Sequence, residues 1–475
     1  MLTNLSFLDE GKAFPPYQET KRLKRYKENK QLFEDEHAEV YKTQFERIER
    51  VIGNFENVVS YATVFNFQKL TTLKIADFVF GSPPVITTNG EKQQKLINKI
   101  LMETDFFIKL YISAIDVSRY GDSVFQISEQ NDKVKLLVTP PSLWFPVVDS
   151  SNIKEFRYHV FCRPYLMDSE KKLYGLKVQI HDPENPSVCE ERRYHLYGKP
   201  GEFKMGKRIS DEKEEQIETM LNVCPVFRVS NTPTSDRCFG IDDYSSIDSI
   251  VSELIVRVSQ VSKVLDRFSS PAMTGPQSAL TYNEEYGRWE LRMADYYERN
   301  NESDPKPEMI VWDASLDANF KQIEILINQL YTISEMGSAV FGDLSNSAGN
   351  IASGTALRRL MMSPLAKARR VANSYDKPIK EMLSLCAAVY GENIPPEDIS
   401  IKWNDGLPSD PLEEANLANI RTGGKATMSR RTAIKRLDSL SESDADAELA
   451  EIEQDEAEAG MGAVPINEPE SVTAV

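Results

Sequence analysis

Cysteine is scarce in this chain, which has five cysteines among 475 residues. They are scattered along the sequence as Cys162, Cys189, Cys224, Cys238 and Cys386. An odd number of widely spaced cysteines argues against a disulfide framework and indicates reduced thiols, as in a cytosol.

Long apolar runs are also missing. The longest, such as FFIKLYISAIDV at 106–117, carry charged residues and are shorter than the roughly 20 residues that a membrane span needs. The stretch 1–17 lacks a basic region followed by an apolar core, so we expect no signal peptide. These two absences predict a protein that makes no contact with a membrane.

The common catalytic motifs are absent as well. The sequence has no phosphate-binding G-x-x-x-x-G-K-[ST], no G-x-G-x-x-G after a strand, no H-E-x-x-H and no G-x-S-x-G. The four histidines, His37, His159, His181 and His195, lie far apart, with no cysteine or carboxylate at ligand spacing. Turn and helix-cap roles explain the carboxylates at 181–186 and 241–243 as well as a chemical role does. We therefore expect no catalytic residue, no metal site and no cofactor.

Positive charge is in deficit, with 56 basic against 73 acidic residues and a net charge of −17. A protein that neutralises the phosphates of duplex DNA is usually basic, so this total alone favours an acidic protein without a nucleic-acid role. The charge is segregated, however: KRLKRYKENK at 21–30 is basic, whereas 438–458 is rich in Asp and Glu and has no Lys or Arg. The total charge therefore decides little about a local contact with DNA.

Helical and strand patterns are both present. A hydrophobic content of 41% and a length for two or three domains indicate a folded protein. Residues 1–15 look irregular, 16–52 resemble a helical arm with few core positions, and 55–80 and 92–121 show helical spacing. Short alternating segments from 123 to 230, separated by Pro, Gly, Asn and Asp, predict an antiparallel β region. The expected fold class is α+β.

Two long helices bracket a small insertion in the second half. The first carries an apolar stripe at i, i+3, i+4, i+7 spacing: Ile247, Ile250, Val251, Leu254, Val258, Val261 and Leu265. The second extends from about Asp317 to Gly337, and the insertion between them has short strand signals. A third helix is predicted from about Gly354 to Tyr390, with Pro364 and Pro378 as kinks. Between the last two helices lies Gly342–Ser353, a polar, glycine-bearing loop without Lys or Arg.

Several stretches, in order, resemble the portal proteins of tailed bacteriophages, in particular those of long-tailed phages of Gram-positive hosts. The stretches are LKIADFVFGSPPVI (73–86), YISAIDVSRYGDSVFQI (111–127), NIASGTALRRLMMSPLAKARRVANSYDKPIKEMLSLC (350–386), IKWNDGLPSDPLEEA (401–415) and TMSRRTAIKRLDSLSESDADAELAEIEQDEAEA (427–459). The strongest is the helix start S-G-x-A-L after a polar loop. Each stretch is short and degenerate, so their order carries the likeness, which covers nearly the whole chain.

The resemblance implies a ring-forming portal fold, typically of twelve subunits, around a DNA channel at one capsid vertex. It implies an N-terminal arm at 1–54, a wing at 55–241, a stem helix at 242–269, a clip at 270–316, a stem helix at 317–340, a tunnel loop at 341–353, a long kinked helix with a return to the wing at 354–414, a crown at 415–460 and a tail at 461–475. The composition of the tail favours disorder.

The resemblance also implies partners and a location. The homo-oligomeric ring passes double-stranded DNA during packaging and ejection, and it docks the large terminase subunit at the clip. Scaffolding and major capsid proteins and a head-tail adaptor protein are the further implied partners. The protein is expected in the virion, at the portal vertex of the capsid, after assembly in the host cytoplasm.

Two groups of residues are candidates for contact with DNA. The implied tunnel loop offers Asp343, Leu344, Ser345, Asn346, Ser347, Gly349 and Asn350, which suit a transient contact without fixed charge. The helices offer Arg257, Lys263, Arg267 and Lys321 as channel-lining basic residues, since a ring repeats each of them as a belt of charge. For each basic residue, an ordinary solvated helix surface explains the sequence equally well.

Two other functions fit the same sequence less closely. An adaptor or minor head protein would be structural but would form no ring with a central channel. A metal-dependent nuclease built from scattered carboxylates would show metal-dependent turnover and a compact monomer. The portal hypothesis instead predicts a structural DNA conduit that is not an enzyme.

Overall fold

The computed structural model describes residues 1–52, 62–130, 133–170, 172–209, 215–219, 221–269, 273–274, 280–291, 308–309, 316–342, 358–404, 411–423, 425–437 and 442–461. The chain divides into two compact units. The first comprises Met1–Leu344 and Met361–Gly406, and the second comprises Ser345–Leu360 and Leu407–Val475.

The N-terminal segment is an integral part of the first unit. A 3-10 helix at Leu5–Leu8 and strand β1 (Ala13–Phe14) precede the helices α1 (Tyr17–Phe33), α2 (His37–Val40) and α3 (Lys42–Ile52). Phe7, Leu8 and Phe14 are buried against the large sheet, whereas Tyr41, Phe45 and Ile48 are buried with residues of α8 (Asp248–Ser269). The helices expected at 16–52 are confirmed, but the expectation of few core positions there was wrong, because Tyr41, Phe45 and Ile48 are buried. The start that was expected to be irregular contains a 3-10 helix and a short strand.

A seven-stranded sheet forms most of the β region. Its strands are β5 (Trp144–Val148), β6 (Phe156–Asp168), β7 (Leu173–His181), β8 (Val188–Lys199), β9 (Glu202–Arg208) and β10 (Glu215–Glu218), with β1 at one edge. All of these strands pair antiparallel, which confirms the predicted antiparallel β region. In β7 the buried Leu176, Val178 and Ile180 alternate with outward residues, because successive strand side chains point to opposite faces.

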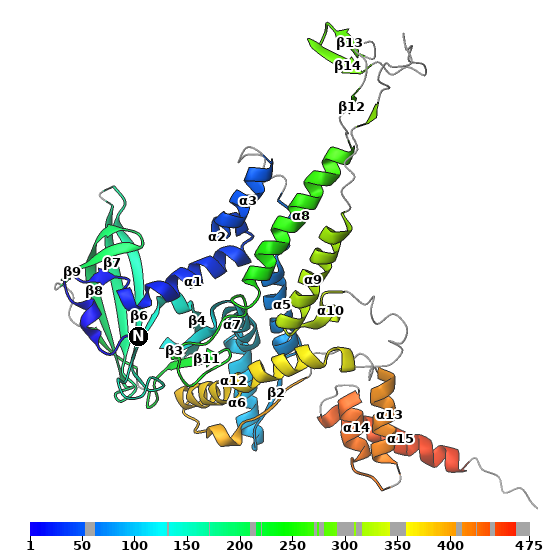
Figure 1. Cartoon of the computed structure of the whole chain (residues 1–475). Coiled ribbons are helices and arrows are strands. Elements are labelled where there is room, and N and C mark those ends of the chain that lie inside the picture. The colour runs from blue at the N-terminus through cyan, green and yellow to red at the C-terminus, as the bar shows by residue number, and fades with distance from the viewer. Residues whose placement is uncertain are drawn as a thin grey trace, which may run out of the picture. The chain divides into compact units, whose positions relative to one another are not determined.

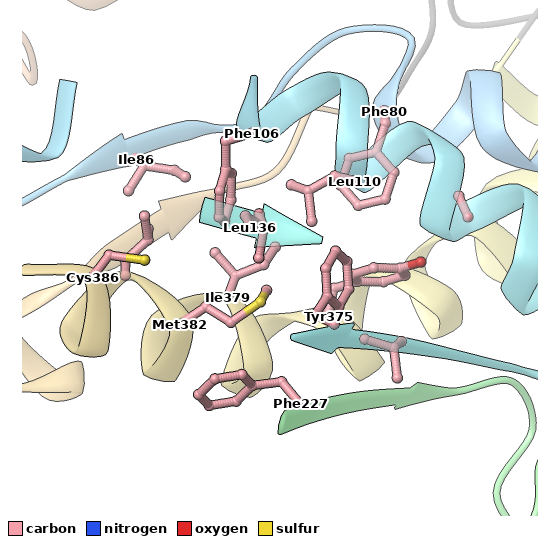
Figure 2. Packing of buried hydrophobic residues seen from close by; sticks show 14 of the residues in the cluster. Phe80, Ile86, Phe106, Leu110, Leu136, Phe227, Tyr375, Ile379, Met382 and Cys386 are labelled. Carbon is pink, nitrogen blue, oxygen red and sulfur yellow. The ribbon is translucent and has the colours of Figure 1, made fainter. Parts of the chain in front are cut away.

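The largest core lies between helices and a second, three-stranded sheet. The sheet has the order β11 (Val226–Ser230), β3 (Asp122–Gln130), β4 (Lys133–Thr139), and the helices are α5 (Phe67–Phe80), α6 (Glu91–Glu103), α7 (Phe106–Tyr120) and α12 (Met362–Val389). Figure 2 shows Tyr375, Ile379 and Met382 of α12 packed among residues of α7, β4 and β11. Strand β2 (Val85–Thr87) pairs with β16 (Ser400–Lys402), which ties the chain after α12 to the same core.

The long helix α12 differs from its prediction at its start. Pro378 lies inside the helix, as expected, but Pro364 lies in the first turn of α12, which begins at Met362. Proline is tolerated in a first turn because its missing N–H has no partner within the helix there. Pro364 is therefore not an internal kink, and the predicted helix start at Gly354 lies outside the described residues.

Helices α8 (Asp248–Ser269) and α9 (Asp317–Ile333) lie side by side in the first unit (Figure 1). The described residues between them form two short antiparallel pairs, β12 (Met273–Thr274) with β15 (Glu308–Met309) and β13 (Leu280–Asn283) with β14 (Arg288–Leu291). After α9 comes a turn and the short helix α10 (Gly337–Val340). The predicted order of helix, small β insertion and helix is confirmed.

The described part of the second unit is helical. It contains α13 (Pro411–Thr422), α14 (Arg430–Leu437) and the acidic α15 (Glu442–Met461). Arg430 of α14 pairs with Glu456 of α15 at 2.9 Å, and Arg431 pairs with Asp446. Within the described part of the chain, no helix is long and apolar enough to cross a membrane.

Candidate functional site at the paired long helices

Helix α8 is amphipathic, as predicted, but its buried face is wider than the predicted stripe. Ile247, Ile250, Val251, Leu254 and Val261 are buried, as are Ile255, Val256 and Ser259. Leu265, the last residue of the predicted stripe, is 49% exposed. The apolar stripe of α8 is therefore exposed at Leu265, four residues before the helix ends.

Polar contacts hold the start of α8. The carboxylate of Asp242 accepts hydrogen bonds from the backbone N–H groups of Tyr244 and Ser245, at 3.1 and 2.8 Å. Arg25 of α1 pairs with Asp242 at 2.8 Å and with Asp248 at 2.7 Å. Burial disfavours the charged guanidinium, yet the two carboxylates outweigh it and raise the pKa of Arg25. The N-terminal helices therefore fix the point at which α8 begins.

The candidate Arg257 belongs to a chain of charges that crosses from α8 to α3. Its guanidinium pairs with Glu253 at 2.8 Å, and Glu253 also pairs with Arg47 at 2.7 Å. Partial burial disfavours the carboxylate, but the two guanidinium groups lower the pKa of Glu253. The positive charges of Arg47 and Arg257 therefore share the one negative charge of Glu253 in this part of α8.

The other three basic candidates come from both helices, α8 and α9. Lys263 is half-buried on α8, and Lys321 of α9 is exposed and pairs with Glu324 at 2.9 Å. Arg267 lies on α8, but its side chain is outside the described residues. Lys263 and Arg267 share a face at i, i+4, whereas Arg257 lies about 120° around the helix from Lys263. Their contact with DNA stays a prediction.

The candidate loop residues Asp343, Leu344, Ser345, Asn346, Ser347, Gly349 and Asn350 lie outside the described residues. The described chain stops at Gly342, which has a φ of +86° and is exposed, and it resumes at Arg358. Phe341, just before the loop, stacks on Tyr331 of α9 and meets the edge of the Phe67 ring. The chain therefore enters the loop from a position that is packed against two aromatic rings.

A joint between α9, α12 and the start of α8 was not predicted. The Nζ of Lys367 donates to the carbonyl oxygen of Ser334 at 2.9 Å and pairs with Asp243 at 3.0 Å. Lys367 is 4% exposed, so this ammonium is buried. A lone lysine in a helix ordinarily faces solvent, so the burial of Lys367 could not be predicted from the pattern of residues around it. Arg47 had a clearer signal, since Tyr41, Phe45 and Ile48 follow i, i+4, i+7 spacing around it.

The histidines are dispersed, and two of them, the buried His159 and the half-buried His181, lie opposite each other on neighbouring strands of the large sheet. Trp144 donates through Nε1 to Nδ1 of His159 at 3.2 Å, and burial lowers the pKa of His159 to about 3. Burial likewise lowers the pKa of His181 to about 4. The described residues contain no group of three His, Cys, Asp or Glu side chains that could hold a metal ion.

These features define a protein of mixed α+β fold, in which polar and charged groups join helix ends and the long helices bracket a small β insertion. The family described as "Phage portal protein, SPP1 Gp6-like" matches residues 14–460. The chain belongs to this family of phage portal proteins.

The family assignment fixes the function. The protein is a component of the virion, at the capsid portal, where it forms the DNA channel of the capsid vertex. It is a structural protein and not an enzyme, so the nuclease and adaptor alternatives are set aside. Membership implies a ring oligomer in the virion.

Comparisons with individual proteins add little to the family match. No protein with curated annotation matches the chain. Among solved structures, a chain from "Virion of native gene transfer agent (GTA) particle" is similar, with 10% identity over 78% of this chain and 89% of that chain. The TM-score is 0.38, so this similarity carries no part of the argument.

Proposed function

We propose that copies of this chain, twelve in the capsid, close into a ring whose channel wall is built by α8 and α9. The observation that carries this proposal is a polar stripe on α9. Lys321, Glu324, Asn328 and Thr332 are all exposed and follow i, i+3, i+7, i+11 spacing, so they share one face of the helix. The opposite side of α9 packs on α8, where Leu330 is buried.

The charge on this stripe suits the passage of DNA. Each phosphate that a protein neutralises adds sequence-independent affinity, so a densely basic wall would hold the duplex rather than let it move. Lys321 is balanced by Glu324 at 2.9 Å, and Arg257 by Glu253 at 2.8 Å. The proposed wall is therefore polar, with cationic belts that are weakened by neighbouring carboxylates.

The tunnel loop at 341–353 is proposed to project into this channel. Asp343, Ser345, Asn346, Ser347, Gly349 and Asn350 offer short polar side chains and glycine, and no cation. Backbone N–H groups and hydroxyl or amide groups can contact phosphates without specifying sequence. We expect the loop to grip or seal the DNA sterically rather than to anchor it by charge.

The remaining parts are assigned by their order in the chain. The proposed clip at 270–316 contains β12–β15 and docks the large terminase subunit, and the proposed crown at 415–460 contains most of α13 together with α14 and α15. The arm at 1–54, the wing at 55–241, the helix and wing return at 354–414 and the tail at 461–475 complete the division. Scaffolding, major capsid and head-tail adaptor proteins are the proposed further partners.

Neutralising the basic residues of α8 tests the proposed wall. A triple variant Arg257→Gln, Lys263→Gln, Arg267→Gln is expected to lower the amount of nuclease-protected DNA per particle by tenfold or more, because three belts of charge disappear from the ring. The measurement is DNA packaged after infection by a phage that carries the variant chain.

A matched control is Lys24→Gln, Lys30→Gln, Lys377→Gln, which removes three charges from side chains that are 76%, 58% and 84% exposed on other helices. The control is expected to package normally. If the α8 variant also packages DNA normally, the proposal that its basic residues line the channel as belts of charge is contradicted.

A further inference from the structure

The end of α9 is an unusual piece of backbone. After Ile333 the chain turns through Ser334 and Glu335, and Glu335 has a φ of +62°, which a non-glycine residue rarely adopts. Gly337 follows with a φ of +70° and begins α10. Met336 between them is 1% exposed and belongs to the main core. The surrounding structure must hold such a turn in place.

One stripe of α12 supplies the groups that hold this turn. Ser363 donates through Oγ to the carbonyl oxygen of Glu335 at 3.0 Å, and Arg370 donates to both carboxylate oxygens of Glu335 at 2.9 Å. Lys367 lies between them on the same face and donates to the carbonyl oxygen of Ser334. Positions 363, 367 and 370 follow i, i+4, i+7 spacing, so the first turns of α12 lie along the end of α9.

Lys367 extends this contact to the start of α8. Its ammonium pairs with Asp243, which is 9% exposed and five residues before the first residue of α8. Asp243 is itself fixed, since its carboxylate accepts from Nδ2 of Asn231 at 3.2 Å and its backbone N–H donates to the carbonyl oxygen of Ser118 at 2.9 Å. One buried ammonium therefore joins α12, the end of α9 and the segment that leads into α8.

A buried ion pair is weak evidence for stability, because the loss of hydration offsets much of the attraction. The position of Lys367 gives a better reason for a charge here. A cation is favoured at the C-terminal end of a helix, where Ser334 presents an unpaired carbonyl group, and the same cation satisfies Asp243. The group thus specifies one arrangement of three elements.

Two described elements that flank the tunnel loop lie beside this joint. Helix α10 leads from the turn at Glu335 to the loop at 341–353, and on its other side Met362 starts the helix that carries Lys367. We propose that Lys367 is a positioning residue that holds α10 and the start of α12, which flank the tunnel loop, against the start of α8. This inference rests on the proposed assignment of 341–353 as the loop that contacts DNA.

Amide hydrogen exchange on the full-length protein tests the joint. Lys367→Met is expected to speed exchange at least tenfold in three segments together, 243–247, 334–337 and 362–366, while exchange in β6 and β7 stays unchanged. The double variant Lys367→Met, Asp243→Asn removes the carboxylate that the single variant leaves buried without its cation, so it keeps the test valid if the single variant folds poorly. In the double variant, exchange is expected to be faster in the same three segments.

The control for exchange is Lys377→Met on the same helix, whose lysine side chain is 84% exposed. It is expected to change none of the three segments. Faster exchange in one segment alone would overturn the proposal, because it would show that the three segments are not coupled through Lys367. Faster exchange spread evenly over the chain would overturn it too, because it would show only a general loss of stability.

Packaged DNA tests the positioning role. Particles built with Lys367→Met are expected to contain at least tenfold less nuclease-protected DNA than particles with Lys377→Met, and equal amounts would overturn the role of Lys367. Deletion of Ser345–Ser347 separates the two proposals. If the deletion abolishes packaging and Lys367→Met does not, only the positioning role fails; if neither change matters, the loop assignment fails too.

Discussion

Arg22 shows how one buried side chain joins the N-terminal segment to the large sheet. Its guanidinium pairs with Glu19 at 2.6 Å and donates to the carbonyl oxygens of Pro141 and Trp144, each at 2.9 Å. It also lies over the ring of Phe239, 4.4 Å from the centroid. Bonds of this kind, made to backbone groups far along the chain, give α1 a fixed place that periodicity alone does not predict.

The buried histidines make stability depend on pH. His159 and His181 are neighbours across β6 and β7, and burial, the first cause in each case, lowers their pKa values to about 3 and about 4. In the unfolded chain a histidine has a pKa near 6.5. Between these values the unfolded state binds protons that the folded state does not, so stability falls as the pH falls below about 6.5.

The variant His159→Gln isolates one of these groups, because glutamine keeps an acceptor for Trp144 but does not titrate. Between pH 7 and pH 5 the wild-type chain is expected to lose about 2 kcal/mol of unfolding free energy through His159 alone. The variant should lose about 2 kcal/mol less over the same range, as measured by denaturant unfolding at each pH. Identical pH profiles for the two proteins would show that the pKa of His159 is the same in the folded and unfolded states.

At this scale the sequence predicted residue types better than residue partners. The basic residues of α8 were visible as candidates, but nothing near Arg257 in the pattern distinguished Glu253 as a neighbour that also pairs with Arg47. The role of Lys367 could not be predicted, because its partners Asp243 and Ser334 lie 124 and 33 positions away along the chain and meet it only in the folded state. Burial, rather than residue type, decides what such a lysine does.

At the scale of elements, α3 supports the first half of α8. Figure 1 shows the two helices adjacent, and Phe45 and Ile48 of α3 are buried together with Ile250, Val251 and Ile255 of α8. The ion pair between Arg47 and Glu253 borders this contact. The N-terminal helices are thus a brace for one of the helices that we place at the channel wall.

Ile48→Ala tests this brace. Ile48 is 1% exposed, and removing its side chain leaves a cavity between α3 and α8, so we expect a loss of about 2–5 kcal/mol of unfolding free energy. Glu46→Ala, an exposed site on the same helix, is the control and should change stability by less than about 0.5 kcal/mol. Equal stabilities of the two variants in denaturant unfolding would contradict the packing of α3 on α8.

The elements with strong periodicity were the ones that sequence alone located well. The stripe of α8 and the span of α9 were predicted to within a few residues, because one face of each is apolar at helical spacing. The N-terminal segment was misjudged, since its core residues are separated by charged ones. The predicted start of the third helix at Gly354 lies outside the described residues, and residues 358–360 just before α12 are helical.

At the scale of the whole molecule, charge is divided between the two units. The net charge of −17 includes the acidic stretch at 438–458, which falls in the second unit together with α15. Arg430 and Arg431 of α14 balance part of it through Glu456 and Asp446. The acidity of the chain is therefore compatible with a DNA channel, because much of the negative charge lies outside the elements that we assign to the wall.

The family, and with it the function, could be predicted from the sequence because the resemblance extended over nearly all of the chain in a consistent order. The closure of the ring could not be predicted from residue patterns, because it depends on surfaces between copies of the chain. The exposed end of the apolar stripe at Leu265 is one feature of the described chain that fits contact with a neighbouring copy.

Electron cryomicroscopy of the purified full-length protein tests the central claim most directly. We predict closed rings around an open channel, with α8 and α9 along its wall, the stripe Lys321, Glu324, Asn328 and Thr332 facing the lumen, and the loop at 341–353 at its narrowest part. Small globular monomers, or rings in which α9 faces outward, would contradict the account.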